Sequence, residues 1–539
     1  MLIIEEVYKM KKFLLAIALL FIPVGVYAQQ TGGEYVSSIT DEDIVIADDS
    51  DSNPRYIGAN PDNYIYYNNE LWRIIGVFNG KLKIVRYESL GKYSYDTSEA
   101  GINNGSGTNE WSQSKLMQEL NSDYLDTTLT ENPKWYSLFK LEKILEFDRS
   151  KVIKNDAQKF IEENTVWHYG TVNFDGNQIY GDTSTQMNPI NFYDREKGNI
   201  IPKYCPNPGY SNCNDTVERT TSWVGKVGLP SISDIFNTVG NSQGISREQC
   251  LSTNHNSWKS TGCKAQAWLI NNEIAYWTMS PKAAEDNGYQ VYTIVTYSSV
   301  LQSMHAYMRE HVFPTIYLKD NTYFTEGRGT DTEPYKIDLM YRVTFDTDGG
   351  STVDTQEYFG DDEVYKAVKP ANPTKENYTF LGWFTENGEE YNFDNQLTGI
   401  VNLKAKWSYN YEIIEGKDQT FENKDIVIKC NGPINDLQSI KDGKNIIDSS
   451  NYTVEEGSTI LTLKKEYLST LSSGVHNITF VYSDGSATTT LTIKEKTSNT
   501  EKLVNPKTGD NIMLYISMLG LSIIGLSSIG IYTKKKIFN

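Results

Sequence analysis

Alternating apolar and polar positions recur along this chain and predict a protein built largely from β-strands. In the amino-terminal part, such runs occupy residues 63–67, 71–78, 82–86, 273–278 and 312–318. Asn79 and Gly80 separate two of these runs, and an Asn-Gly pair in that place favours a hairpin turn. The alternation returns at 425–429 and 459–463, with turn residues at the spacing of a β-sandwich.

Two stretches show helical instead of strand periodicity. Apolar residues recur at helix spacing in 112–124 and 138–163, between the early and the late strand runs. Mixed helices and strands predict an α+β domain over residues 56–338. Two β modules follow, at 341–407 and 411–494, and the chain is multidomain, as its 539 residues lead us to expect.

The amino terminus is typical of a secretory signal peptide. A lysine-containing segment, 9–12, precedes the apolar run 13–24, and Ala28 ends a cleavage site. We therefore expect residues 1–28 to be removed on export. An uncleaved membrane helix is the alternative, but the apolar run is short for one. Two glutamates precede the basic segment, so Met10 is an alternative start.

The carboxyl-terminal residues 505–539 combine three features in a fixed order. A pentapeptide comes first, then the almost uncharged run 512–532, then the basic cluster 534–536. The run is long enough to cross a bilayer core of roughly 30 Å as a transmembrane helix. A basic cluster holds its end of such a helix on the cytoplasmic side. The pentapeptide consists of Asn505, Pro506, Lys507, Thr508 and Gly509.

This order resembles the cell-wall sorting signal of Gram-positive surface proteins. In that family a sortase cuts an LPxTG-type motif between Thr and Gly and joins the Thr to a peptidoglycan amine. The resemblance implies cleavage of the Thr508–Gly509 bond, with sortase and peptidoglycan as partners. Asn505 stands where the commonest motif has Leu, which leaves the class of sortase open. A plain membrane anchor is the alternative.

Charge excludes one class of partner. The formal charge is -19 and the pI about 4.9, whereas nucleic-acid binding requires a basic surface. Acidity instead keeps an exported protein soluble. Residues 29–55 are acidic and polar and predict a disordered leader. Residues 495–504 predict a short linker before the sorting signal.

The chain has five cysteines, all in its exported part. Local pairing is the simplest of the three connectivities that four of them allow, and gives possible disulfides Cys205–Cys213 and Cys250–Cys263. Each bridge would close a short polar loop that cannot bury apolar surface for itself. Cys430 is left over, and we expect it to be a small buried residue in a strand.

Aromatic and turn motifs mark both ends of the α+β domain. They lie at 66–85, 109–116, 277–281, 313–318 and 327–337. These motifs resemble a domain of surface proteins of anaerobic Firmicutes, whose fold is related to C-type lectins and to formylglycine-generating sulfatase activators. The activators need a reactive cysteine pair near the end of the domain. Here the last domain cysteine is Cys263, so the resemblance does not imply their activity.

Each β module has motifs of its own. In 341–407 the segments 378–384 (YTFLGWF) and 401–407 (VNLKAKW) resemble the Listeria–Bacteroides repeat, also called the internalin B-type repeat. That resemblance implies a β-grasp-like fold, and such a module can be a spacer without a ligand. In 411–494 the segments 451–454 and 474–485 resemble the X2-type immunoglobulin-like module of bacterial extracellular proteins.

Catalytic and metal motifs are missing from the sequence. It has no G-x-S-x-G elbow, no H-E-x-x-H and no Gly-rich phosphate loop after a strand. There is no C-x-x-C pair and the five histidines are scattered, so we expect no zinc site and no cofactor. His305 and His311 lie near Glu310, but spacing alone supports no catalytic pair. We therefore expect no enzyme activity and assign no catalytic residue.

Binding is the function that the sequence favours: a wall-anchored, adhesin-like protein that displays its α+β domain on β spacers. The alternative is a surface enzyme, a polymer hydrolase or modifying enzyme, on the same scaffold. The ligand is a host or environmental molecule, with glycans among the candidates, because aromatic residues beside Asn and Asp grip sugars. Most tryptophans are nonetheless core residues. The α+β domain contains Trp72, Trp111, Trp135, Trp167, Trp223, Trp258, Trp268 and Trp277.

Overall fold

The computed structural model describes residues 29–495, apart from 41–43, 47–48, 98–106, 137–143, 171, 173–187, 199–219, 242–243, 271–273, 283–287, 296–299 and 361–363. The predicted signal peptide, sorting motif and transmembrane run, and the predicted disulfide partners Cys205 and Cys213, all lie outside the described residues. Within the described part, no helix is both long and apolar enough to cross a membrane. The chain divides into two compact units, 1–376 with 380–407, and 377–379 with 408–539.

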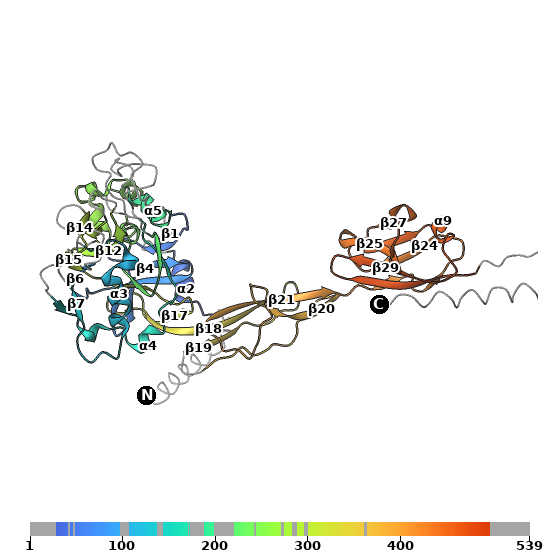
Figure 1. Ribbon diagram of the computed structural model, residues 1–539, viewed down its shortest axis with the longest axis horizontal. Helices are drawn as coiled ribbons and strands as arrows, with labels where there is room; N and C mark the ends of the chain where they lie inside the picture. The colour runs from blue at the N-terminus through green and yellow to red at the C-terminus, as the bar shows by residue number, and fades with distance from the viewer. Residues whose placement is uncertain are drawn as a thin grey trace, which may run out of the picture. The chain divides into compact units, whose positions relative to one another are not determined.

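One β-sheet forms the frame of the large amino-terminal domain (Figure 1). Its strand order is β1-β2-β4-β5-β16-β11, with β3 paired to β4. The strands are β1 (Ile44–Ile46), β2 (Pro54–Tyr56), β3 (Tyr64–Tyr67), β4 (Glu70–Phe78), β5 (Lys81–Arg86), β11 (Val227–Gly228) and β16 (Thr315–Tyr317). The predicted hairpin turn is confirmed, since Asn79 (φ 50°) and Gly80 (φ 77°) both have the positive φ of a type I′ turn.

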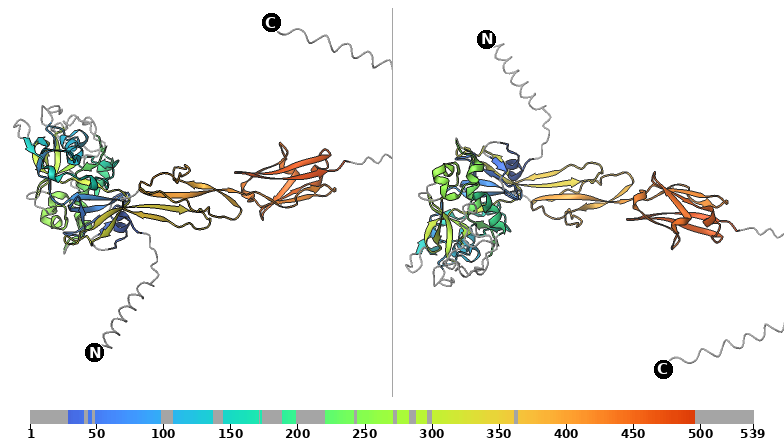
Figure 2. Two further views of the ribbon diagram at one scale, coloured as in Figure 1. Left: turned by 90° about the horizontal axis from the view of Figure 1, so that it is seen from below. Right: turned by 90° about the horizontal axis from the view of Figure 1, so that it is seen from above.

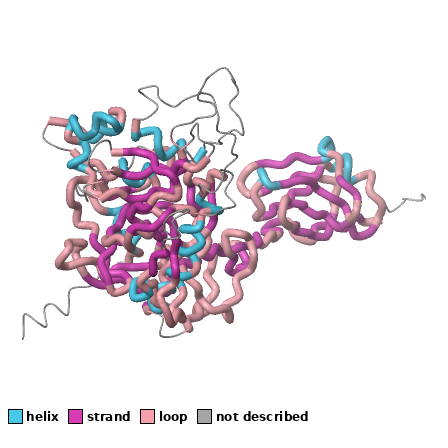
Figure 3. The backbone as a smooth tube through the Cα atoms, turned by 60° about the vertical axis from the view of Figure 1, so that its left-hand side comes forward, coloured by secondary structure: helices cyan, strands magenta, loops and turns pink. Residues whose placement is uncertain are grey.

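A second sheet and short helices complete this domain. The second sheet has the order β14-β13-β12-β15-β6, and two strand pairs, β7–β8 and β9–β10, lie outside both sheets. Figure 3 shows the helices as short segments among the strands. The strands are β6 (Lys92–Ser94), β7 (Lys134–Tyr136), β8 (Ile144–Glu146), β9 (Val166–His168), β10 (Ser222–Val224), β12 (Tyr276–Pro281), β13 (Gln290–Ile294), β14 (Leu301–His305) and β15 (Arg309–His311). The helices used below are α2 (Gly32–Ser38), α3 (Lys115–Asn121), α4 (Asn155–Gln158), α5 (Phe192–Gly198), α6 (Ile232–Phe236) and α7 (Arg247–Leu251).

Of the two predicted helices, one is confirmed and the other is wrong. The prediction over 112–124 holds as α3 with a 3-10 turn on either side. The helix predicted over 138–163 is wrong, because its described part consists of β8, a 3-10 turn and the short α4. Asp148 caps that 3-10 turn by accepting from the Ser150 N–H at 3.0 Å, and such local bonds compete with a continuous helix.

The prediction of a disordered leader at 29–55 is also wrong. Its described residues form α2, β1 and β2. Thr31 and Glu34 close a capping box at the start of α2, and Val36 is fully buried in the domain core. A Cβ on Gly33 would lie 2.0 Å from the Gly80 carbonyl oxygen, so only glycine lets α2 pack on the β4–β5 turn. The acidic composition suggested disorder, but acidic residues such as Asp49 form ion pairs inside the folded domain.

β18 (Lys336–Asp346) is a single strand that crosses the predicted domain boundary at 338–341. Its first part pairs with β17 (Thr322–Glu326), and its last part pairs in parallel with β21 (Ile400–Tyr409). Leu339 belongs to the core of the large domain and Val343 to that of the repeat. Figure 2 shows β18 and β21 as long strands from two directions.

Arg342, near the middle of β18, ties three elements together. Its guanidinium lies 2.9 Å from Glu34 of α2 and 3.1 Å from Glu357 of β19 (Gln356–Phe359). The remainder of the repeat is β20 (Tyr378–Phe384), which adds to β21 at the sheet edge. Trp383 is 2% exposed and packs edge-to-face on Phe345, which makes it the centre of this small core.

The second unit is a β-sandwich with two sheets, of order β22-β24-β28-β27 and β23-β30-β29-β25-β26. The strands are β22 (Ile413–Glu415), β23 (Gln419–Thr420), β24 (Ile426–Cys430), β25 (Leu437–Asp442), β26 (Asn445–Ile446), β27 (Tyr452–Glu455), β28 (Thr459–Leu463), β29 (Gly474–Tyr482) and β30 (Ser486–Ile493). Alternate residues of β24 and β28 enter its core, as the predicted strands require. The chain is therefore multidomain and mostly β-sheet.

Fragment boundaries give a direct test of this architecture. A fragment 56–338 lacks α2, β1, nearly all of β2 and Leu339, and so loses one sheet edge and part of the core. We expect it to melt well below a fragment 29–340, with a less cooperative transition in near-ultraviolet circular dichroism. Equal melting temperatures for the two fragments would mean that residues 29–55 contribute nothing to the fold.

Candidate functional site

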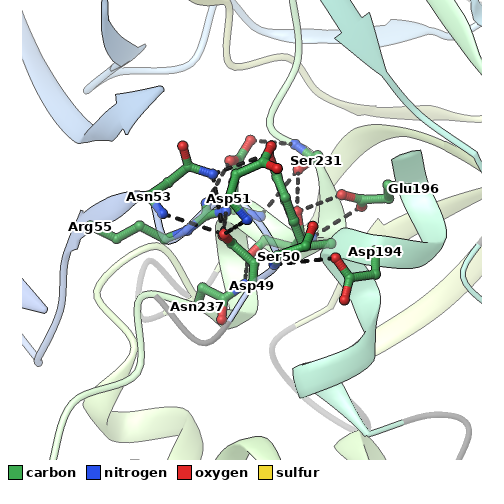
Figure 4. A network of polar contacts seen from close by, with 12 residues as sticks. Asp49, Ser50, Asp51, Asn53, Arg55, Asp194, Glu196, Ser231 and Asn237 are labelled. Carbon is green, nitrogen blue, oxygen red and sulfur yellow. Dashed lines mark hydrogen bonds and ion pairs between the residues drawn. The ribbon is translucent and has the colours of Figure 1, made fainter. Parts of the chain in front are cut away.

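A buried carboxylate on α6 collects two cations from the main sheet. Arg55 of β2 approaches Asp234 with Nη1 at 3.1 Å from Oδ1, and Lys83 of β5 places Nζ at 2.5 Å from Oδ2. The second guanidinium nitrogen of Arg55 lies 3.0 Å from Asp49 (Figure 4). All four side chains are 5% exposed or less, so solvent screens these pairs little.

The sequence around Asp234 explains why a carboxylate can occupy this place. Asp234 is the third residue of α6 and closes a capping box with Ser231, whose N–H donates to Oδ2 at 3.0 Å. Although burial alone would raise the pKa of Asp234, Lys83 and Arg55 hold it below its ordinary value. The residue is therefore an ionised hub with both oxygens satisfied.

Glu196 of α5 is a second buried carboxyl beside this hub. Its oxygens accept from the Ser233 N–H at 3.0 Å and from the Ser233 hydroxyl at 2.5 Å. No ion pair to Glu196 occurs among the described residues. Burial, with the nearby negative charge of Asp234, raises the pKa of Glu196 to about 7, against the effect of the Ser233 hydrogen bonds.

Lys83, Glu196 and Asp234 line the floor of a cleft of about 250 Å³ in the large domain. Four aromatic rings from four different elements line it, namely Phe78, Trp167, Tyr193 and Tyr317. The Trp167 indole is held in place by its Nε1–H, which donates to the Gly225 carbonyl at 2.9 Å. The Lys83 ammonium lies 5.1 Å from the centre of the Trp167 ring and 5.2 Å from those of Phe78 and Tyr317.

The rim of the cleft is polar. Lys197 and Tyr193 both donate to Asp51, at 2.6 and 2.7 Å, and these hydrogen bonds lower the pKa of Asp51. His168, on β9, also lines the cleft. Partial burial lowers the pKa of its imidazole, so the ring is neutral near pH 7. The cleft therefore offers aromatic walls, paired charges and neutral polar groups, which suits binding of a small polar molecule.

Several residues that the sequence marked as candidates lie in the hydrophobic cores or form a disulfide. Of the eight tryptophans of the domain, all but Trp223 are 2% exposed or less and belong to its cores. Cys250 and Cys263 form a disulfide with a Cα–Cα distance of 5.6 Å, and Cys430 is a buried free thiol. In the described part of the chain, no group of histidine, cysteine and carboxylate side chains could hold a metal ion.

Sequence reasoning missed Arg55, Lys83, Glu196 and Asp234 as a group. In the sequence, Arg55 lies 141 residues from Glu196 and still farther from Asp234, so only the fold brings these side chains together. One local signal was present, because Ser231 and Asp234 have capping-box spacing just ahead of apolar residues. Arg55 is the last residue of the segment predicted to be disordered. The acidic composition of that segment gave no indication that Arg55 and Asp49 form an ion pair.

Comparison with known families supports the two carboxyl-terminal modules. Residues 341–406 match the Listeria-Bacteroides repeat domain (List_Bact_rpt), and residues 393–493 match the Carbohydrate binding domain X2. Both predicted resemblances are thus confirmed. These domain types fit an extracellular surface protein that binds carbohydrate or acts as an adhesin. The cleft lies outside both matched segments.

The raised pKa of Glu196 predicts that the stability of the protein depends on pH. Its pKa is about 7 in the folded protein and 4.5 ordinarily, so the folded state binds more protons than the unfolded state between these values. Stability should therefore fall as pH rises from 5 to 8, by on the order of 1–3 kcal/mol at about 1.4 kcal/mol per pKa unit. Urea unfolding of wild type and Glu196→Gln across this range measures the difference.

The Gln variant should lose this part of the pH dependence and gain stability relative to wild type above pH 7. Glu248→Gln, at an exposed position of α7, is the matched control and should follow the wild-type curve. Parallel curves for wild type and Glu196→Gln would show that Glu196 does not titrate in this window.

Proposed function

We propose that this chain is a bacterial cell-surface protein, exported through residues 1–28 and joined to peptidoglycan by a sortase at Thr508. The order of motif, apolar run and lysine cluster in 505–539 carries this proposal. The two matched extracellular modules support it independently, because they are domain types that fit a surface protein.

Within this proposal the large domain is the adhesin-like, ligand-binding part, with a fold of the C-type-lectin and sulfatase-activator kind. Its cleft supports a binding role, since it combines aromatic walls with polar groups. The ligand is a molecule of the host or the environment, and the X2 match makes glycans a candidate class. The repeat and the sandwich act as spacers or as additional binding modules.

One observation favours the alternative of a surface enzyme. A buried carboxyl with a pKa of about 7, such as Glu196, can act as a general acid or base at neutral pH. Its hydrogen bonds to Ser233 and the neighbouring ion pairs equally suit a structural role, so we propose binding without turnover. Release of product from any bound surface polymer would instead establish the enzyme.

Sorting is tested by cell fractionation. The double variant Thr508→Ala/Gly509→Ala removes the scissile bond that the motif resemblance implies. We expect this variant to be extracted with membranes by detergent, whereas wild type is released only by wall-digesting enzymes. Lys507→Ala is the matched control, because it changes the variable position of the motif, and it should behave as wild type. Covalent attachment of the double variant to peptidoglycan would contradict the proposal.

A further inference from the structure

Arg73 of β4 is a buried cation that has no carboxylate partner among the described residues. The side chains of Arg55, Arg86 and Arg342 are also buried, and each of them forms an ion pair with a carboxylate. Arg73 is only 6% exposed. Burial lowers the pKa of Arg73 to about 10, so its guanidinium is still charged at neutral pH. A buried charge that no opposite charge compensates attracts an anion more strongly than an arginine in open solvent does.

Neighbouring groups hold the Arg73 guanidinium in one orientation. Its Nε donates to Oδ1 of Asn63 at 2.7 Å, and its Nη2 donates to the Pro61 carbonyl at 3.1 Å. The guanidinium carbon lies 4.3 Å from the centres of the Tyr64 and Trp268 rings. These hydrogen bonds use two of the three guanidinium nitrogens, and none from Nη1 occurs within the described ranges. One charged donor is therefore left for a ligand.

Arg73 lines a small pocket that shares no lining residue with the cleft. Val85, Leu269 and Phe313 form apolar parts of its wall. Tyr87 is the most exposed of the lining residues, at 41%, and its ring centre lies 5.7 Å from that of Tyr64. No hydrogen bond to the Tyr87 hydroxyl occurs in the described part of the chain. The pocket therefore has a second donor at its exposed side.

The size and charge of the pocket select one kind of anion. Its volume is about 20 Å³, whereas one water-sized group needs roughly 10–15 Å³. Room for one or two such groups fits the pair of oxygens of a carboxylate, and a phosphate has twice as many. A carboxylate also brings a single negative charge, which matches the single uncompensated guanidinium of Arg73.

We propose that this pocket binds the carboxylate group of a small organic monoacid. Nη1 of Arg73 donates to one carboxylate oxygen, and the Tyr87 hydroxyl donates to the other. Because the pocket holds only the carboxylate, the remainder of the acid extends past Tyr87 into solvent. This inference goes beyond the proposed function, since it adds to the large domain a second binding site that is separate from the cleft.

Ligand-observed NMR on the full chain in detergent, at neutral pH and constant ionic strength, tests the ligand class. The probes are acetate and propionate, with acetamide and propionamide as neutral counterparts of the same shape. Inorganic phosphate is followed through its displacement of acetate. We expect both carboxylates to bind, and the amides and phosphate to bind at least tenfold more weakly, because the amides lack the charge and phosphate is too large.

Two variants with matched controls test the location. Tyr87→Phe removes one hydroxyl and should weaken acetate binding at least threefold, as the loss of one hydrogen bond does. Its control is Tyr66→Phe, at 43% exposure in the same domain, which should bind as wild type. Arg73→Gln removes the charge and should abolish binding, whereas Arg328→Gln, whose side chain is 82% exposed, should retain it. If Arg73→Gln melts below wild type, Tyr87→Phe decides the location.

Three results would overturn this inference. The first is equal or tighter binding of the amides or of phosphate, which would contradict the ligand class. The second is unchanged acetate binding in Tyr87→Phe or in Arg73→Gln, which would place the acid elsewhere. The third is binding of no probe, which would show that the pocket holds water only. None of them bears on ligand binding by the cleft or on wall attachment, because both are tested separately.

Discussion

The ion pairs around Asp234 are the constraint on which the large domain depends. A buried carboxylate is costly unless cations and hydrogen-bond donors satisfy it, and here Arg55, Lys83 and the Ser231 N–H do so. Arg55 lies on β2, Lys83 on β5 and Asp234 on α6, so the cluster fixes one helix against two strands of the main sheet. Lys83 and Asp234 of this cluster also line the floor of the cleft.

Satisfying charges internally has a consequence for binding. Because each cleft lysine already has a carboxylate partner, Glu196 and the neutral side chains of the rim are the polar groups of the cleft that remain without an ion pair among the described residues. Rigid aromatic residues lose little entropy on binding, and a floor fixed by ion pairs needs little reorganisation. Under the proposed binding function, stability and recognition draw on one arrangement of residues.

The sequence predicted local features well and long-range ones poorly. Asn79-Gly80 specified a hairpin because two adjacent residues determine a type I′ turn, and the YTFLGWF segment identified the repeat. In contrast, the acidic residues before Arg55 suggested disorder, since composition does not reveal that Asp49 has a buried partner. The cleft joins side chains from β4, β5, β9, α5, α6, β16 and the segment just before β2, and no local pattern brings them together. The sequence also did not reveal that β18 is one continuous strand. Its first half contributes to the core of the large domain and its second half to the core of the repeat.

A double-mutant cycle on Lys83 and Asp234 tests this account most directly. Lys83→Met and Asp234→Asn each leave buried charges without their partner, and each should cost about 3 kcal/mol or more in the free energy of unfolding. The account predicts that the double variant loses clearly less than the sum, with a coupling energy above about 1 kcal/mol. Additive losses, within about 0.5 kcal/mol, would show that the pair does not act as a unit and would contradict the account.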